Sequence, residues 1–201
     1  VLTSTGSGVA WEAGGGGGGV TFKEGGTNFT NSLMVGDDAT GTLNAATGNT
    51  GLGKDVFAAL TSGDNNVAVG FGALKATTTA GSNTAVGASA MEGCTTGEYN
   101  VAVGSLCMDA VLTGNFNTAI GRAALGANTT GSSNCAVGIN ALGANTTGGN
   151  NCAMGDSALD ANTTGSNNVA IGINALGTAT TAHQNTACGN IALTVLTTGA
   201  C

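Results

Sequence analysis

The chain has 201 residues, of which 37 are Gly, none is Pro, 7% are charged and 3% are aromatic, and its net charge is −7. Ordinary soluble domains carry about 25% charged residues, and the four basic residues of this chain cannot neutralise several phosphates, so the composition argues against nucleic-acid binding. The 41% hydrophobic content argues against a disordered chain, and no apolar run approaches the roughly 20 residues of a membrane-spanning helix.

Residues 1–31 differ in composition from the rest and are predicted to form an N-terminal connector. Six consecutive glycines at residues 14–19 are typical of a flexible linker. Residues 20–23 read Val-Thr-Phe-Lys and are predicted to form a strand that leads into the first repeat. Two interpretations stay open for this segment, a simple hinge or a connector to an upstream part of a longer fibre.

Residues 32–201 are predicted to form a second domain built from an internal repeat. The motif Asn-x-Ala-x-Gly recurs every 17 residues without insertion or deletion, beginning at Asn66, Asn83, Asn100, Asn117, Asn134, Asn151, Asn168 and Asn185. Two degraded copies begin one and two periods earlier, at Asn49 and Ser32. The repeat therefore predicts about ten coils of a stacked architecture.

The residues within each unit predict an all-β fold. Seventeen residues cannot hold a pair of helices, and Gly, Asn and Thr are poor in helix interiors. Counting the Asn as position 1, we expect a strand at positions 1–5, a turn, a second short strand around the Ala-Leu of positions 8–9, and a Thr-Thr-Gly turn. Gly and Asn supply corners with positive φ. Coils stacked about 4.8 Å apart would give a parallel β-solenoid, a rod of roughly 48 Å.

The columns formed by stacking predict which side chains are buried. Position 4 is Val or Ile in most copies and is expected to face the core, whereas the Ala of position 3 is expected to form a face that another surface can approach closely. The Asn of position 1 is expected to form a ladder of amide hydrogen bonds. Two large aliphatics per coil, at about 1.5–3 kcal/mol each, do not offset an ordering cost on the order of 25 kcal/mol. Self-association is therefore expected.

Candidate chemistry begins with the six cysteines, which are Cys94, Cys107, Cys135, Cys152, Cys188 and Cys201. Cys135 and Cys152 share a repeat position and should stack, Cys188 replaces the Val/Ile that is expected to be buried, and Cys107 replaces an Ala. Cys94 and Cys201 are expected in turns. They are interpreted as small buried hydrophobes, with a Cys135–Cys152 disulfide or bonds between chains as the alternative. No Cys-x-x-Cys occurs and His183 is the only histidine, so no structural zinc site is predicted.

Other motifs follow the repeat and indicate no catalytic site. The Gly-x-Gly strings such as residues 70–72 precede no predicted helix and are not phosphate loops. Residues 37–38, Asp-Asp, are interpreted as an exposed turn, with cation binding as the alternative. Asn-x-Thr triplets that match glycosylation acceptors lie at Asn28, Asn128, Asn145 and Asn162. Adjacent Thr residues point to opposite sides, which weakens an ice-binding interpretation. We predict no enzyme activity, no metal and no cofactor.

The strings at residues 65–70 (Asn-Asn-Val-Ala-Val-Gly) and 167–172 (Asn-Asn-Val-Ala-Ile-Gly) resemble the head repeats of trimeric autotransporter adhesins. That resemblance implies a left-handed parallel β-roll with three chains packed side by side. The longer units with Ala-Leu and Thr-Thr-Gly-Ser-Asn-Asn resemble repeats of phage tail fibres and related virion appendages, and residues 1–13 resemble the connector that precedes distal domains of such fibres. The coil is longer than the usual adhesin unit, and no stalk, neck or membrane barrel is seen, which favours the virion family.

The resemblance implies a homotrimeric structural fibre or spike of a phage virion, acting as a rigid spacer or host-attachment element. Its partners would be copies of itself, other tail or capsid proteins and a host cell-surface receptor. The alternative is the head of a bacterial trimeric adhesin at the cell surface. An ice-binding solenoid is a third interpretation from a different class.

Overall fold

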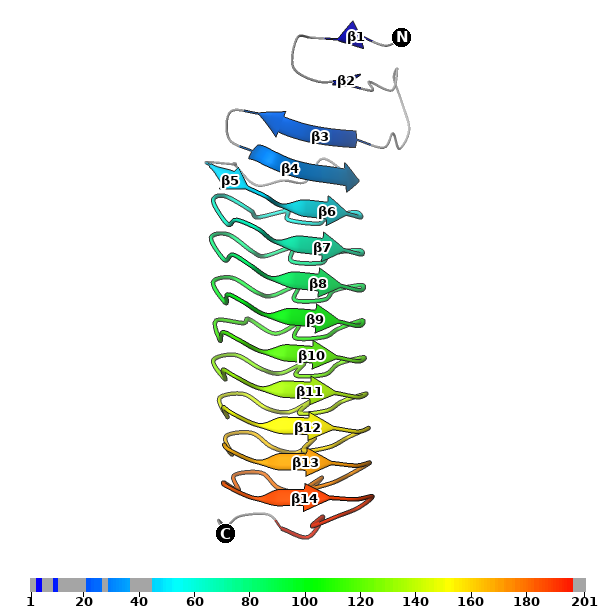
Figure 1. Ribbon diagram of the computed structural model, residues 1–201, viewed down its shortest axis with the longest axis vertical. Helices are drawn as coiled ribbons and strands as arrows, with labels where there is room; N and C mark the ends of the chain where they lie inside the picture. Colours follow the sequence, from blue (N-terminus) through cyan, green and yellow to red (C-terminus); the bar gives the residue numbers. More distant parts are fainter. Residues whose placement is uncertain (1–2, 5–8, 11–20, 27–28, 37–44, 197–201) are drawn as a thin grey trace.

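The computed structural model shows a β-solenoid whose coils stack along one long axis (Figure 1). It describes residues 3–4, 9–10, 21–26, 29–36 and 45–196. Within these residues all regular structure is β, which confirms the all-β prediction. The predicted Gly linker and the Asp-Asp pair, with Asn28 and Cys201, lie outside the described residues.

Two pairs of antiparallel strands lie at the N-terminal end of the described chain. β1 (Thr3–Ser4) pairs with β2 (Val9–Ala10), and β3 (Thr21–Gly26) pairs with β4 (Phe29–Gly36). A strand was expected at residues 20–23, and β3 covers most of that stretch. Because β3 runs antiparallel to β4, it lies against the end of the strand stack as its last member.

The repeat forms one parallel sheet whose strands are paired in register. β4 contains the first degraded copy and pairs in parallel with β6 and with the short β5 (Ala46–Thr47). Each later strand pairs with residues 17 positions away, for example Ala119 with Ala136. The strands are β6 (Thr50–Leu52), β7 (Val67–Val69), β8 (Thr84–Val86), β9 (Val101–Val103), β10 (Thr118–Ile120), β11 (Cys135–Val137), β12 (Cys152–Met154), β13 (Val169–Ile171) and β14 (Thr186–Cys188).

The predicted 17-residue register is therefore confirmed. About eight complete turns lie between β6 and β14, rather than ten, because residues 37–44 and 197–201 are outside the described part. At about 4.8 Å per coil the stack from β6 to β14 is roughly 38 Å long.

A glycine at position 5 ends every strand at a corner. The backbone φ of this column lies between 127° and 141°, a region that L side chains rarely adopt. A Cβ added to Gly121 would also lie 2.4 Å from the carbonyl oxygen of Gly138 in the next coil. Conformation and space therefore both require glycine here, as the sequence predicted.

The segment after this corner is not a strand, so the prediction of a second strand is wrong. The Ala-Leu pair lies in a run of turns, and the leucine has a left-handed backbone, with φ of 51° at Leu125. This conformation directs the Leu125 N–H along the solenoid axis, where it donates to the Ala141 carbonyl of the next coil at 3.0 Å. Ala123, two residues earlier, is also left-handed and donates to Ser105 of the preceding coil at 3.0 Å. Coil-to-coil bonding thus continues without strand geometry.

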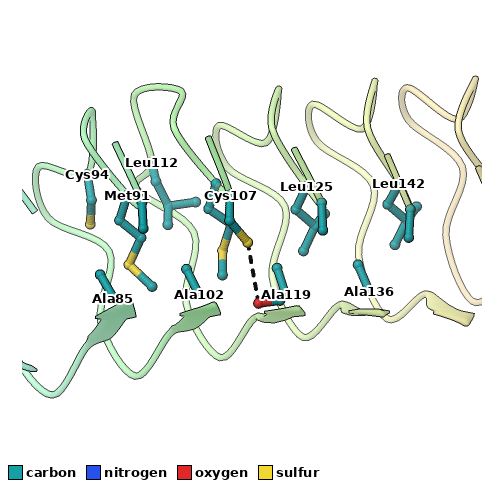
Figure 2. Close-up of a cluster of buried hydrophobic side chains, with 14 of the residues drawn as sticks. Ala85, Met91, Cys94, Ala102, Cys107, Leu112, Ala119, Leu125, Ala136 and Leu142 are labelled. Carbon is teal, nitrogen blue, oxygen red and sulfur yellow. Dashed lines mark hydrogen bonds between the residues drawn. The ribbon is translucent and has the colours of Figure 1, made fainter. Parts of the chain in front are cut away.

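The interior is narrow, and the two sides of each strand face the opposite way from the prediction. The Ala of position 3 points inward and is fully buried, and it faces the buried Leu or Met of position 9 from the opposite wall. Figure 2 shows this arrangement for Ala119 and Ala136, opposite Leu125 and Leu142. The Val/Ile of position 4 points outward. The larger side chain was expected inside, but the leucine already fills the space and only alanine fits opposite it.

The Asn column forms the predicted ladder. Each side chain from Asn49 to Asn185 is buried. Asn117 shows the pattern, because its Nδ2 donates to Gly131 O at 2.9 Å and to Asn100 Oδ1 at 3.1 Å, while its backbone N also donates to Asn100 Oδ1 at 2.9 Å. The ladder therefore satisfies backbone groups at the start of every strand.

A second, shorter ladder stands at position 12. Asn145 Nδ2 donates to Asn128 Oδ1 at 3.0 Å, and Asn162 Nδ2 donates to Asn145 Oδ1 at 2.8 Å. The next coil has the buried Ala179 at this position. The Oδ1 of Asn162 is consequently a buried acceptor with no hydrogen-bond partner.

Candidate functional site

The most distinctive surface is the outer face of strands β6–β14, which we call the outer strand face and define as positions 2 and 4 of each coil. The Ala between these positions is buried, so both neighbours point away from the interior. Ile120 is 42% exposed and Met154 is 43% exposed. The position 4 column consists of Leu52, Val69, Val86, Val103, Ile120, Val137, Met154, Ile171 and Cys188.

This face has no charged side chain at positions 2 and 4 of β6–β14, which contain only Val, Ile, Leu, Met, Cys and Thr. Its length of roughly 38 Å and the width of two columns, about 10 Å, give an uncharged, mainly apolar stripe on the order of 400 Å², which includes the hydroxyls of four threonines at position 2. Large apolar side chains of position 6, Phe71, Ile139 and Ile173, are exposed beside it. The largest apolar patch on a typical soluble monomer covers about 300–600 Å² and is often functional.

Sequence reasoning missed this surface although a signal for it was present. Strands that are apolar at consecutive positions, as in Val-Ala-Val of β7, are typical of sheets covered on both faces. Alternation separated the two columns, and we assigned the larger Val/Ile side chains of position 4 to the core, so the outer face was expected to be alanine. Neither the inner nor the outer side of these strands carries a charged residue, which indicates that the outer side is also suited to burial.

Three of the described cysteines lie in this face, and two of them, Cys135 and Cys152, confirm the predicted stacking. Cys135 and Cys152 are paired in register on β11 and β12, and both thiols are free and half-buried. Desolvation raises the pKa of the Cys135 thiol, and the neighbouring Cys152 raises it further. Cys188 was expected in a buried column, but it is exposed because position 4 points outward.

The other two described cysteines are inside the solenoid, as predicted. Cys107 takes the place of a buried Ala and its Sγ donates to Ala119 O at 3.3 Å (Figure 2). Burial raises the pKa of Cys107 to about 12, and burial likewise raises the pKa of Cys94 to about 11. Both thiols are therefore held in the protonated, unreactive form at neutral pH.

The Thr pair separates into an inner and an outer column. Thr129 is half-buried, and its Oγ1 donates to the Thr146 carbonyl of the next coil at 3.0 Å. Thr130 is exposed, and so are its equivalents in neighbouring coils. Adjacent threonines thus point apart as predicted, and one exposed Thr per coil remains on this side.

The remaining candidate residues have structural environments. Asn128, Asn145 and Asn162 are fully buried within the second ladder, so their side chains are not accessible to glycosylation. His183 is exposed as expected, and its Nδ1 accepts a hydrogen bond from Ser166 N at 3.0 Å. Residues 70–72 lie at a corner and turn and do not precede a helix.

Among the described residues, no group of three or more His, Cys, Asp or Glu is placed to hold a metal ion. The absence of a catalytic or cofactor site stays a prediction. In the same part of the chain no helix is long and apolar enough to cross a membrane. No protein-family model, curated protein or solved structure matches this chain.

Proposed function

We propose that this chain is a structural segment of a phage virion fibre or spike, that it assembles as a homotrimer through the outer strand face, and that it acts as a rigid spacer or host-attachment element. The observation that supports assembly is the uncharged apolar stripe along β6–β14. The virion assignment rests on the resemblance of the repeat and of residues 1–13 to tail-fibre sequences.

The free energy available from this face limits how copies can pack. About 400 Å² at roughly 25 cal/mol per Å² gives on the order of 10 kcal/mol per chain. Association costs about 4–15 kcal/mol in lost translational and rotational freedom. The gain offsets that cost only if the whole length of the stripe is covered, which requires copies that are aligned along their long axes.

A cyclic arrangement meets this requirement. When the symmetry axis is parallel to the solenoid axis, every coil lies at the level of the same coil in its copies. Ile120 of one chain then meets apolar residues of β10 from the others, and the stripe is covered from β6 to β14. Such a closed bundle of stacked coils is stiff along its length, as a spacer requires.

Solution mass tests the assembly. We expect the full chain to have about three times its own mass of 19.0 kDa in sedimentation equilibrium. The double variant Ile120→Lys/Val137→Lys places two charges in the stripe and is expected to be monomeric. Thr130→Lys adds a charge at an exposed position away from the stripe and is the matched control, expected to remain trimeric. A monomeric parent chain, or a trimeric Ile120→Lys/Val137→Lys variant, would contradict the proposal.

The biological setting is tested separately. Mass spectrometry of purified virions should detect the chain among the particle proteins, and the genes beside its own should encode tail proteins. The alternative is a head domain of a bacterial trimeric adhesin, which has the same assembly. Neighbouring genes for secretion machinery, together with the chain on bacterial cells rather than on particles, would favour that alternative.

A further inference from the structure

An exposed aromatic pair stands at position 17 of two neighbouring coils. The rings of Tyr99 and Phe116 are stacked with centroids 5.2 Å apart and an angle of 7° between their planes. Tyr99 is 54% exposed and Phe116 is 60% exposed. Aromatic residues make up only 3% of the chain, so two adjacent exposed rings are not a consequence of its general composition.

Folding of the chain does not account for these two side chains. Every residue of this column has a left-handed backbone, with φ of 58° at Tyr99 and 59° at Phe116. That conformation favours Asn and disfavours bulky residues, and the column is otherwise Asn65, Ser82, Ser133, Asn150, Asn167 and Gln184. The Leu and Met residues of position 9 from Leu74 to Leu176 have the same backbone conformation, but their side chains are buried in the core. Tyr99 and Phe116 combine the unfavourable conformation with exposed apolar area, a combination that is found at functional sites.

The column has only a short side chain at either end of the aromatic stack. The adjacent coils place Ser82 above Tyr99 and Ser133 below Phe116 in this column, and a serine is too short to cover an aromatic face. A planar or chair-shaped ring at the level of either serine would continue the stack at the spacing of about 4.8 Å set by the coils. Apolar C–H faces are suited to packing on aromatic rings at this distance.

Polar groups beside the stack indicate which ring it would take. Glu98 precedes Tyr99 and is exposed, and Asn115 precedes Phe116, with its Oδ1 accepting from Glu98 N at 2.7 Å. A carboxylate, an amide and a serine hydroxyl are suited to hydrogen bonding with sugar hydroxyls. The net charge of −7 and the nearby Glu98 carboxylate disfavour phosphate, and with it nucleotides.

We propose that Tyr99 and Phe116, with Glu98 and Asn115 beside them, form a binding site for a neutral saccharide. The site would give the attachment role a ligand of defined chemistry. It lies at position 17, outside positions 2 and 4, and does not depend on the oligomeric state of the chain.

The test uses the full chain on an array of neutral and anionic oligosaccharides, followed by titration calorimetry with the best retained neutral sugar. We expect Tyr99→Ser/Phe116→Ser, which restores the residue of the neighbouring coils, to weaken binding about tenfold or more. Val111→Ser removes an apolar side chain that is 61% exposed in a different turn and should leave binding unchanged.

Three outcomes would overturn the proposal. The first is that no neutral sugar on the array binds the chain, and the second is that the Tyr99→Ser/Phe116→Ser variant binds the sugar with unchanged affinity. The third is a fall in the solution mass of that variant, which would assign the aromatic pair to the contact between chains. Because the mass and the sugar affinity are measured independently, failure of the saccharide site and failure of trimer assembly are distinguishable.

Discussion

Replacing Asn117 by Ala removes one rung from the middle of the Asn ladder. The Oδ1 of Asn117 accepts from Asn134 N at 3.0 Å and from Asn134 Nδ2 at 3.2 Å. The variant loses these bonds and the two that Asn117 Nδ2 donates. Gly131 O keeps a bond from Asn128 Nδ2 at 2.9 Å, and Asn100 Oδ1 keeps the bond from the backbone N of residue 117 at 2.9 Å. The group left without a partner is the buried N–H of Asn134.

The loss of these hydrogen bonds is expected to destabilise the folded chain. A buried N–H without an acceptor costs about 1–3 kcal/mol, and each lost hydrogen bond contributes about 1 kcal/mol net. Since these terms are not additive, we expect Asn117→Ala to lower the free energy of unfolding by about 3–5 kcal/mol. The effect should spread to both neighbours, because each coil of a solenoid is stabilised by contact with the coils beside it.

Urea denaturation followed by far-UV circular dichroism measures this loss, with all proteins at one concentration so that self-association affects each equally. Asn150→Ser is the matched control, because Asn150 is exposed at position 17 and Ser133 stands in the same column of the preceding coil. The control should change stability by less than about 0.5 kcal/mol. A loss below about 1 kcal/mol in Asn117→Ala, with an unchanged m-value, would refute the view that the ladder holds the coils together.

Two further substitutions test the interior. Ala179→Asn gives the Oδ1 of Asn162, which has no hydrogen-bond partner, a donor, so it should raise the free energy of unfolding by about 1 kcal/mol in the same denaturation assay. A destabilised variant would mean that position 12 of this coil has no room for the amide. Burial raises the pKa of the Cys107 thiol from 9.0 to about 12, so its protonated form favours the folded state and its contribution is lost as the pH rises from about 9 to about 12. Cys107→Ala should therefore lose less stability than the parent chain over this range, and parallel stability curves for the two proteins would contradict the assignment.

The features that could be predicted from the sequence are those set by the repeat and by single residue types. A register of 17 residues without insertion fixes which residues stack, so the Asn ladder and the pairing of Cys135 with Cys152 followed directly. Glycine at position 5 of each 17-residue unit predicted the corners, since few other residues adopt the backbone φ found there. Neither inference depends on which side of the strand faces inward.

The orientation of the strand and the path after the corner could not be predicted in the same way. A period of two separates Ala119 from its neighbours Thr118 and Ile120 but does not say which set is inside. The answer depends on Leu125, which occupies the space opposite the strand and leaves room only for alanine. Leu125 itself has a positive φ, which is rare for leucine. No propensity indicates that conformation, so the expected second strand was wrong.

In the proposed assembly, folding and association depend on different columns of residues. Leu125 and Ala119 are buried within one chain, whereas Ile120, one residue after Ala119, is covered only if another chain approaches. A substitution at Leu125 should therefore lower the stability of each coil directly, and a substitution at Ile120 should act through the concentration at which chains associate. The proposed assembly would explain why strands three residues long are uncharged on both faces, since one face completes the coil and the other would be covered by a copy of the chain.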